Sequence, residues 1–171
     1  MVALAPLIRD IPDFPKKGIL FKDITTLLKE PLAFKQAIDE LTDNVRGYQP
    51  EVVIGMESRG FIFAAPIAYQ LGAGFVPVRK LGKLPGQVIS TEYDLEYGTN
   101  TLELHSDAVT PGQRVLIVDD LLATGGTVSA TIELVERLKG EVAAVAFLVE
   151  LTGLRGRERL DRYDVVSLIK F

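Results

Sequence analysis

The sequence predicts an α/β fold in which a central, mainly parallel sheet is flanked by helices. Short apolar runs alternate along the chain with amphipathic segments, which is the order typical of strands connected by covering helices. One apolar run also ends in two carboxylates and a glycine-containing turn, as expected at the edge of an open parallel sheet. The predicted strands are 51–55, 74–79, 114–118, 141–150 and 164–170.

Helices are predicted between these strands because apolar residues recur there at helical spacing. Phe34, Ile38 and Leu41 share one face of the first such segment. Gly72 and Gly140 are suited to end the two later helices. The predicted helices are 32–45, 60–71 and 126–139.

Two regions depart from this alternation. Residues 11–26 contain Pro12, Pro15 and Gly18, so we expect an irregular segment that lies over the sheet. Residues 80–97 are rich in Gly, Pro, Thr and charge, and predict a long loop. A loop of this length in a compact domain is usually functional or disordered.

Composition narrows the class of protein. A chain of 171 residues that is 47% hydrophobic is expected to form one domain, 1–171. Its net charge of -4 gives no field that would attract nucleic acid or an anionic membrane. The absence of cysteine and of any apolar run of ~20 residues predicts a cytoplasmic protein without disulfides or a membrane span. His105 is the single histidine, which excludes a multi-histidine metal site.

The most informative motif is 115–127, an apolar run followed by Asp119, Asp120 and the turn 123–127. A buried central strand would place both acids at its carboxyl end. The glycines allow the backbone to wrap a phosphate, and the helix that follows presents unpaired N–H groups. The alternative is that the acids cap a helix and the glycines form only a turn.

Adjacent acids would repel a lone phosphate, so the ligand should also carry groups that suit carboxylates, such as sugar hydroxyls or a magnesium ion. A phosphorylated ribose meets both requirements. The Gly-Lys-Ser/Thr ending of a Walker loop and the dinucleotide fingerprint are both absent from this motif.

The motif resembles the signature of type I phosphoribosyltransferases, which bind phosphoribosyl pyrophosphate (PRPP). The resemblance implies that Asp119 and Asp120 bind the ribose hydroxyls. It also implies that the loop binds the 5′-phosphate through Ala123, Thr124, Gly125, Gly126 and Thr127.

Further segments resemble the adenine phosphoribosyltransferases in particular, in the same order along the chain. The similarity extends from about residue 11 to the C-terminus, through 14–25, 57–61, 79–86, 95–98 and 148–152. It implies a hood of about residues 1–30 over the base, in which Phe21 stacks on adenine while the backbone of Leu20 and Lys22 contacts it. Judged alone, Phe21 could equally be a core residue.

The resemblance assigns pyrophosphate binding to Arg59 and to the backbone of Glu57 and Ser58. It also allows for a cis peptide bond between Glu57 and Ser58. Position 57 is Glu where some relatives have Asp, a mild departure for a backbone contact. Arg79, Lys80 and Lys83 add cations that could stabilise departing pyrophosphate or remain solvated surface charges.

The resemblance implies a catalytic set of Glu96, Arg59 and Lys83, with Glu96 controlling protons on the base. Judged alone, Glu96 could be a surface carboxylate. Mg²⁺ is expected to be held mainly by PRPP and water, without confident direct protein ligands.

A homodimer is implied as well, with 148–159 contributing to its interface, and in some members of the family a loop is donated across subunits. The alternatives are a phosphoribosyltransferase for another base, or a regulator that binds PRPP without turnover. The small molecules adenine and PRPP are therefore the expected partners.

Overall fold

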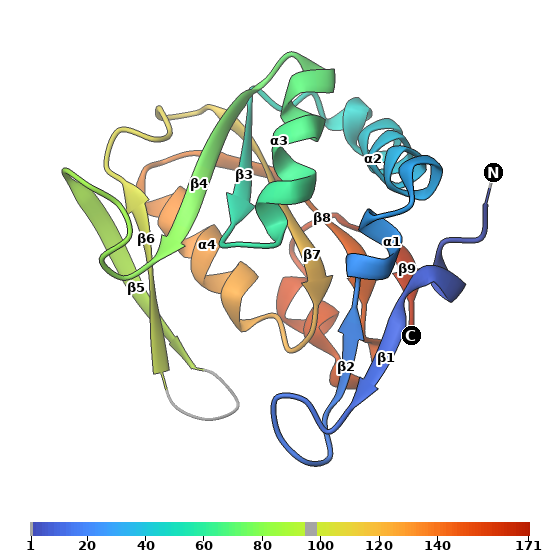
Figure 1. The fold of residues 1–171 in the computed structure, drawn as a ribbon. Coiled ribbons are helices and arrows are strands. Elements are labelled where there is room, and N and C mark those ends of the chain that lie inside the picture. Colours follow the sequence, from blue (N-terminus) through green and yellow to red (C-terminus); the bar gives the residue numbers. More distant parts are fainter. Residues whose placement is uncertain (1, 95–98) are drawn as a thin grey trace. The chain divides into compact units, whose positions relative to one another are not determined.

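The structure of the chain is a computed structural model, which describes residues 2–94 and 99–171 (Figure 1). The chain forms two compact units, Met1–Glu40 and Leu41–Phe171. The helix α2 (Pro31–Val45) runs across the boundary between them.

The N-terminal unit is built around a small hairpin. Its strands pair antiparallel, with Arg9 opposite Asp23 and Pro12 opposite Leu20. The prediction of irregular structure for 11–26 was therefore wrong for the strands and for the short helix that follows. The turn-forming residues lie in the connection, where the Gly18 N–H donates to Asp13 Oδ1 at 2.6 Å. The elements before α2 are η1 (Ala5–Leu7), β1 (Arg9–Pro12), β2 (Leu20–Asp23) and α1 (Thr25–Leu28).

The larger unit contains a sheet with the strand order β5-β6-β4-β3-β7-β8-β9. Strands β4, β3, β7, β8 and β9 are parallel, while β6 runs antiparallel to both β4 and β5. This confirms the mainly parallel sheet. The elements after α2 are η2 (Arg46–Tyr48), β3 (Val52–Met56), α3 (Gly60–Leu71), β4 (Gly74–Lys80), β5 (Val88–Asp94), β6 (Thr99–His105), β7 (Arg114–Leu122), α4 (Gly126–Arg137), β8 (Glu141–Glu150), η3 (Thr152–Leu154), η4 (Gly156–Leu160) and β9 (Val165–Lys170).

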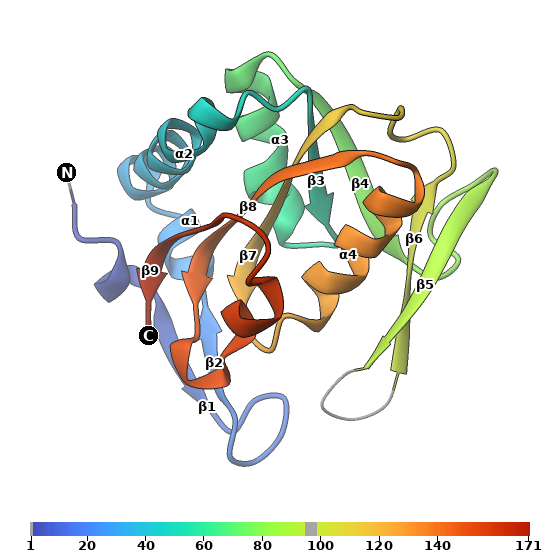
Figure 2. The ribbon, with the colours of Figure 1, turned by 180° about the vertical axis from the view of Figure 1, so that it is seen from behind.

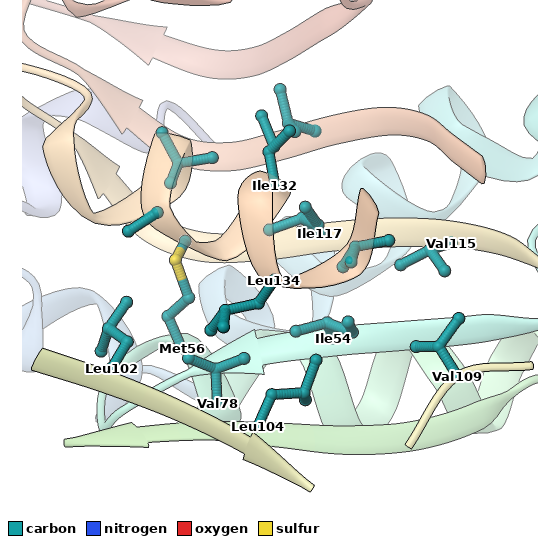
Figure 3. Close-up of a cluster of buried hydrophobic side chains, with 14 of the residues drawn as sticks. Ile54, Met56, Val78, Leu102, Leu104, Val109, Val115, Ile117, Ile132 and Leu134 are labelled. Carbon is teal, nitrogen blue, oxygen red and sulfur yellow. The ribbon is translucent and has the colours of Figure 1, made fainter. Parts of the chain in front are cut away.

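Helices α3 and α4 cover opposite faces of this sheet, as the side-chain alternation of β3 shows. Ile54 and Met56 point into the buried cluster that contains Ile132 of α4 (Figure 3). Gly55 points the other way, where an added Cβ would lie 2.8 Å from the Ala64 Cβ of α3. The central strands are therefore buried on both faces, which explains their continuous apolar sequence.

The predicted loop over 80–97 was wrong for 88–94, which form the edge strand β5. Ile89 and Tyr93 share a face at period two and pack against the buried cluster, while Leu102 and Leu104 of β6 are buried within it. The alternation of these side chains favours a strand despite the charged and hydroxylic residues between them.

Candidate functional site

Three segments that the sequence connects to phosphate and sugar binding meet at one edge of the sheet. Because β3 lies between β4 and β7 and runs parallel to both, their carboxyl ends lie side by side (Figure 1). The segment 57–59 follows β3, the segment 79–83 spans the end of β4, and 119–127 spans the end of β7. This is the edge at which open α/β sheets bind their ligands.

The turn between β7 and α4 forms the predicted phosphate cradle. Gly125 is the N-cap of α4 with φ at +83°, and no side chain caps the helix. The N–H groups of the first turn are thus left for a ligand. The pocket here has a volume of about 70 Å³, far below the ~300–1,000 Å³ of sites that enclose a whole organic ligand. It suits one phosphate group and is lined by Asp119, Leu121, Leu122, Ala123, Thr124, Gly125, Gly126, Thr127, Val128 and Phe147.

Asp119 lines the pocket formed by this turn, and Asp120 follows it on β7. Burial and the neighbouring Asp120 carboxylate raise the pKa of Asp119 well above its ordinary value. Burial also raises the pKa of Asp120, although Arg59 opposes this with an Nη2–Oδ2 distance of 2.9 Å. The pair therefore favours a ligand that brings hydroxyl donors or positive charge.

The N-terminus of α3 packs closely against Asp119. A Cβ on Gly60 would lie 2.8 Å from Asp119 Oδ1 and 3.0 Å from the Val118 carbonyl oxygen. Glycine is thus required for this approach. The sequence predicts Gly60 only as the start of a helix, because a long-range contact leaves no local pattern.

Glu57 joins two of the segments through its side chain. Its carboxylate accepts hydrogen bonds from Arg79 Nε at 3.2 Å and from the Lys80 N–H at 3.0 Å. Burial raises the pKa of Glu57, but these hydrogen bonds outweigh it and the net pKa is lowered. The Glu57–Ser58 peptide bond is cis. The resemblance implies a role only for the backbone of Glu57, and the structure adds these contacts of its carboxylate.

Strand β6 also contacts the turn after β4, through the side chain of Glu103. The Gly82 N–H donates to Glu103 Oε2 at 2.8 Å, and Arg79 Nη1 donates to the Lys83 carbonyl oxygen at 3.1 Å. Lys80 and Lys83 are exposed on this braced turn. Glu103 was not predicted, since a buried carboxylate on a strand has no local signature.

Three further predicted residues belong to the N-terminal unit. Leu20, Phe21 and Lys22 belong to β2 of the N-terminal unit, where the Phe21 ring centroid lies 5.1 Å from that of Phe14. Lys22 Nζ lies 2.6 Å from Asp10 Oδ1. Glu96 falls outside the described residues.

Residues 2–94 and 99–171 contain neither a metal-binding cluster nor a membrane-spanning helix. No three His, Asp or Glu side chains in these ranges come together as a metal-binding group. Within the same ranges no helix is both long and apolar enough to cross a bilayer.

A phosphate turn and paired acids at the carboxyl edge of a parallel sheet are features of phosphoribosyltransferases, and the family model "Phosphoribosyl transferase domain" matches residues 24–170. The adenine phosphoribosyltransferase of Desulfitobacterium hafniense is 59% identical over 164 residues, covering 96% of this chain and 95% of the relative. The chain belongs to the adenine phosphoribosyltransferase family.

Solved structures of the same family agree with this assignment. The adenine phosphoribosyltransferase of Thermoanaerobacter pseudethanolicus superposes with a TM-score of 0.96 at 58% identity, covering 98% of each chain. The Saccharomyces cerevisiae enzyme gives a TM-score of 0.90 at 39% identity, covering 95% of this chain and 94% of that one. The yeast structure is a complex with D-2,5-dideoxy-2,5-imino-altritol 1,6-bisphosphate and adenine.

Proposed function

We propose that this chain transfers the 5-phosphoribosyl group of PRPP to N9 of adenine, giving AMP and pyrophosphate in purine salvage. The observation that carries the proposal is the phosphate turn 123–127 directly beside Asp119 and Asp120, in a chain of this family. That pairing suits a phosphorylated sugar, because the turn offers N–H donors and the acids accept from hydroxyls.

Each half of PRPP has a matching set of groups. Ala123, Thr124, Gly125, Gly126 and Thr127 would bind the 5′-phosphate. Asp119 and Asp120 would accept hydrogen bonds from the ribose 2′- and 3′-hydroxyls, because such donors favour the charged carboxylates that burial disfavours.

The pyrophosphate would be bound where the segments after β3 and β4 meet. Arg59, Arg79, Lys80 and Lys83 supply cations there, together with the backbone N–H groups at 57–58. Arg59 pairs with Asp120 in this structure, so it would contact both the acid pair and the departing anion. Cations aimed at a leaving group stabilise the charge that develops in the transition state.

In the reaction the bond between C1′ of the ribose and the pyrophosphate oxygen breaks, with oxocarbenium character at C1′. Adenine N9 then attacks the opposite face and forms the new C1′–N9 bond. The base loses one imidazole proton, and we assign control of that proton to Glu96. The remaining contribution of the protein is positioning and electrostatic stabilisation.

Adenine binding is assigned to Phe21, with the backbone of Leu20 and Lys22 contacting the edge of the base. An aromatic ring offers a stacking surface to any base, while backbone groups distinguish its edge. The hood role of about residues 1–30 is part of this proposal.

Mg²⁺ is expected near the acid pair, because the raised pKa values of Asp119 and Asp120 favour added positive charge there. When bound, the ion would neutralise charge on PRPP oxygens. Since the described residues include no group of three ligands, we propose that PRPP and water hold it.

We further propose a cytoplasmic homodimer in which residues 148–159 contribute to the interface. The cytoplasmic placement rests on the lack of cysteine in the sequence. The dimer rests on the resemblance to the family, and sedimentation of the purified protein would test it.

The proposed activity is tested by offering adenine, guanine, hypoxanthine, xanthine and orotate separately with PRPP and Mg²⁺, and separating the nucleotides by chromatography. We expect rapid AMP formation from adenine alone. Turnover of another base would retain the PRPP site but contradict the role of Phe21. PRPP binding without turnover of any base would favour a regulator.

A further inference from the structure

The backbone of the segment after β8 contacts the phosphate turn at Gly156. A Cβ on Gly156 would lie 2.2 Å from the Ala123 carbonyl oxygen and 3.0 Å from the Gly125 nitrogen. In the reverse direction, a Cβ on Gly125 would lie 2.9 Å from the Gly156 carbonyl oxygen. Figure 2 shows this segment beside the end of β7 and the start of α4. The two backbones are thus in direct contact without room for a side chain.

Gly156 is held in place by the residue that follows it. Arg157 Nε and Nη2 donate to Glu150 Oε1 and Oε2 at 2.9 and 2.6 Å, and Nη1 donates to the Val165 carbonyl oxygen at 2.9 Å. Ser167 Oγ donates to the same Glu150 carboxylate at 2.6 Å. A bidentate pair of this kind fixes geometry as well as charge.

Glu150, the acid of this ion pair, ends strand β8, which pairs with β7, the strand that leads into the phosphate turn. Glu150 lies opposite Leu122 in the parallel register of β8 and β7, and the Leu151 N–H donates to the Leu122 carbonyl oxygen at 2.9 Å. Leu160, at the other end of η4, is buried. The segment from Glu150 to Leu160 is therefore fixed at both ends against the sheet.

We propose that Gly156, held by the Arg157–Glu150 ion pair, is a positioning residue that sets the conformation of the phosphate turn and so its affinity for the 5′-phosphate. The proposal rests on the proposed function for the identity of the ligand. Glu150, Gly156 and Arg157 would thus act on the phosphate turn without lining the pocket themselves.

The test measures two ligands by calorimetry in the presence of Mg²⁺: ribose 5-phosphate, which would engage the phosphate turn, and pyrophosphate, which would engage the segments after β3 and β4. In Gly156→Ala the new methyl must displace the Ala123 carbonyl. Its affinity for ribose 5-phosphate should fall roughly tenfold or more, as for a lost hydrogen bond to a charged group. Its affinity for pyrophosphate should be unchanged.

Gly153→Ala is the matched control, because a Cβ there meets nothing within 4 Å. It should bind both ligands like the wild type. Arg157→Lys keeps the charge but loses the bidentate geometry, and should show a smaller loss for ribose 5-phosphate alone. This variant carries the test if Gly156→Ala does not fold.

Two results for folded Gly156→Ala would overturn the proposal: wild-type affinity for ribose 5-phosphate, or an equal loss of affinity for both ligands. If Gly156→Ala does not fold, the same two results for Arg157→Lys would overturn it. Failure of the proposed function is a separate result. If the wild type binds ribose 5-phosphate but makes no AMP, the proposed activity is contradicted. The positioning role would still be supported by a loss of affinity in Gly156→Ala that is confined to ribose 5-phosphate.

Discussion

Arg59 Nη2 lies 2.9 Å from Asp120 Oδ2, and this ion pair joins the segment after β3 to the end of β7. The cation assigned to pyrophosphate thus already contacts an acid assigned to ribose. The two halves of the proposed PRPP site are electrostatically linked through these two side chains.

Arg59→Ala should lower kcat/KM for PRPP by about 10²–10³, the range for loss of one group that stabilises developing charge. The change removes a cation from the leaving group and also leaves Asp120 buried without this partner. Steady-state kinetics would measure the effect. Arg46→Ala removes an exposed arginine that precedes β3, at the opposite end of that strand from residues 57–59, and should retain activity. Equal kinetics for the two variants would contradict the role of Arg59.

Gly60→Ala should reduce activity because the methyl must displace Asp119 Oδ1 or the Val118 carbonyl. A misplacement approaching 1 Å can cost about 10²-fold in rate, so we expect kcat/KM for PRPP to fall by about 10–10². Gly47→Ala adds the same methyl where nothing lies within 4 Å and is the control. Unchanged kinetics in Gly60→Ala would show that this close approach is dispensable.

The acid pair should titrate abnormally. Burial and Asp120 raise the pKa of Asp119, so carboxyl ¹³C NMR of the free protein should place its midpoint above the ordinary ~3.9. Asp120→Asn removes the neighbouring charge and should lower that midpoint. Because the folded pKa exceeds the unfolded one, the contribution of Asp119 to stability is greatest below the unfolded pKa and is lost as pH rises through the folded pKa. An ordinary midpoint for Asp119 in the wild type would contradict this electrostatic picture.

Glu150→Gln should destabilise the fold at neutral pH. Hydrogen bonds from Arg157 lower the pKa of Glu150 to about 2, so its contribution is present above the unfolded pKa and is lost as pH falls toward the folded one. Because the Arg157 side chain is partly exposed, we expect a loss of about 1–3 kcal/mol in the free energy of unfolding at pH 7. Urea unfolding should show the difference shrinking between about pH 4.5 and pH 2.

Glu158→Gln is the control for that measurement, since Glu158 pairs with Arg155 at 3.2 Å while both side chains are largely exposed. Exposed pairs contribute only about 0–1 kcal/mol. If the two glutamine variants were equally stable at pH 7, the Glu150 ion pair would have no special role.

Phe21→Ala should raise KM for adenine roughly tenfold or more, given about 1–3 kcal/mol for an aromatic–base stack, while KM for PRPP changes little. Phe21→Tyr keeps the ring and should restore the lower KM for adenine. If Phe21→Ala instead raised only the KM for PRPP, Phe21 would be assigned to PRPP binding and not to adenine binding.

The central sheet and its helices were predictable because burial on both faces leaves a strong pattern in the sequence. The run at 115–118 and the helical spacing after Gly126 identify β7 and α4 directly. The edge strand β5 was missed, because only Ile89 and Tyr93 reveal its buried face among polar neighbours. The β1–β2 hairpin was missed because its prolines and glycine dominate the local sequence.

At the site, the residues of the phosphate turn were predictable because their chemistry is contiguous in sequence. The contacts of Glu57, Gly60, Glu103 and Gly156 were not, since each depends on a partner from another strand or segment. Phe147 lines the pocket from β8 for the same reason. Such contacts follow from the strand order, which periodicity along the chain does not reveal.

The most direct test of the account compares AMP formation from adenine and PRPP in the wild type and in Asp119→Asn, with circular dichroism to confirm that both are folded. The substitution keeps the shape of the side chain. It removes the negative charge and replaces one of the two oxygens that would accept hydrogen bonds from the ribose hydroxyls. We predict rapid AMP formation by the wild type and a loss of about 10² or more in kcat/KM for the folded variant. Full activity in Asp119→Asn would contradict the assignment of this edge of the sheet as the PRPP site.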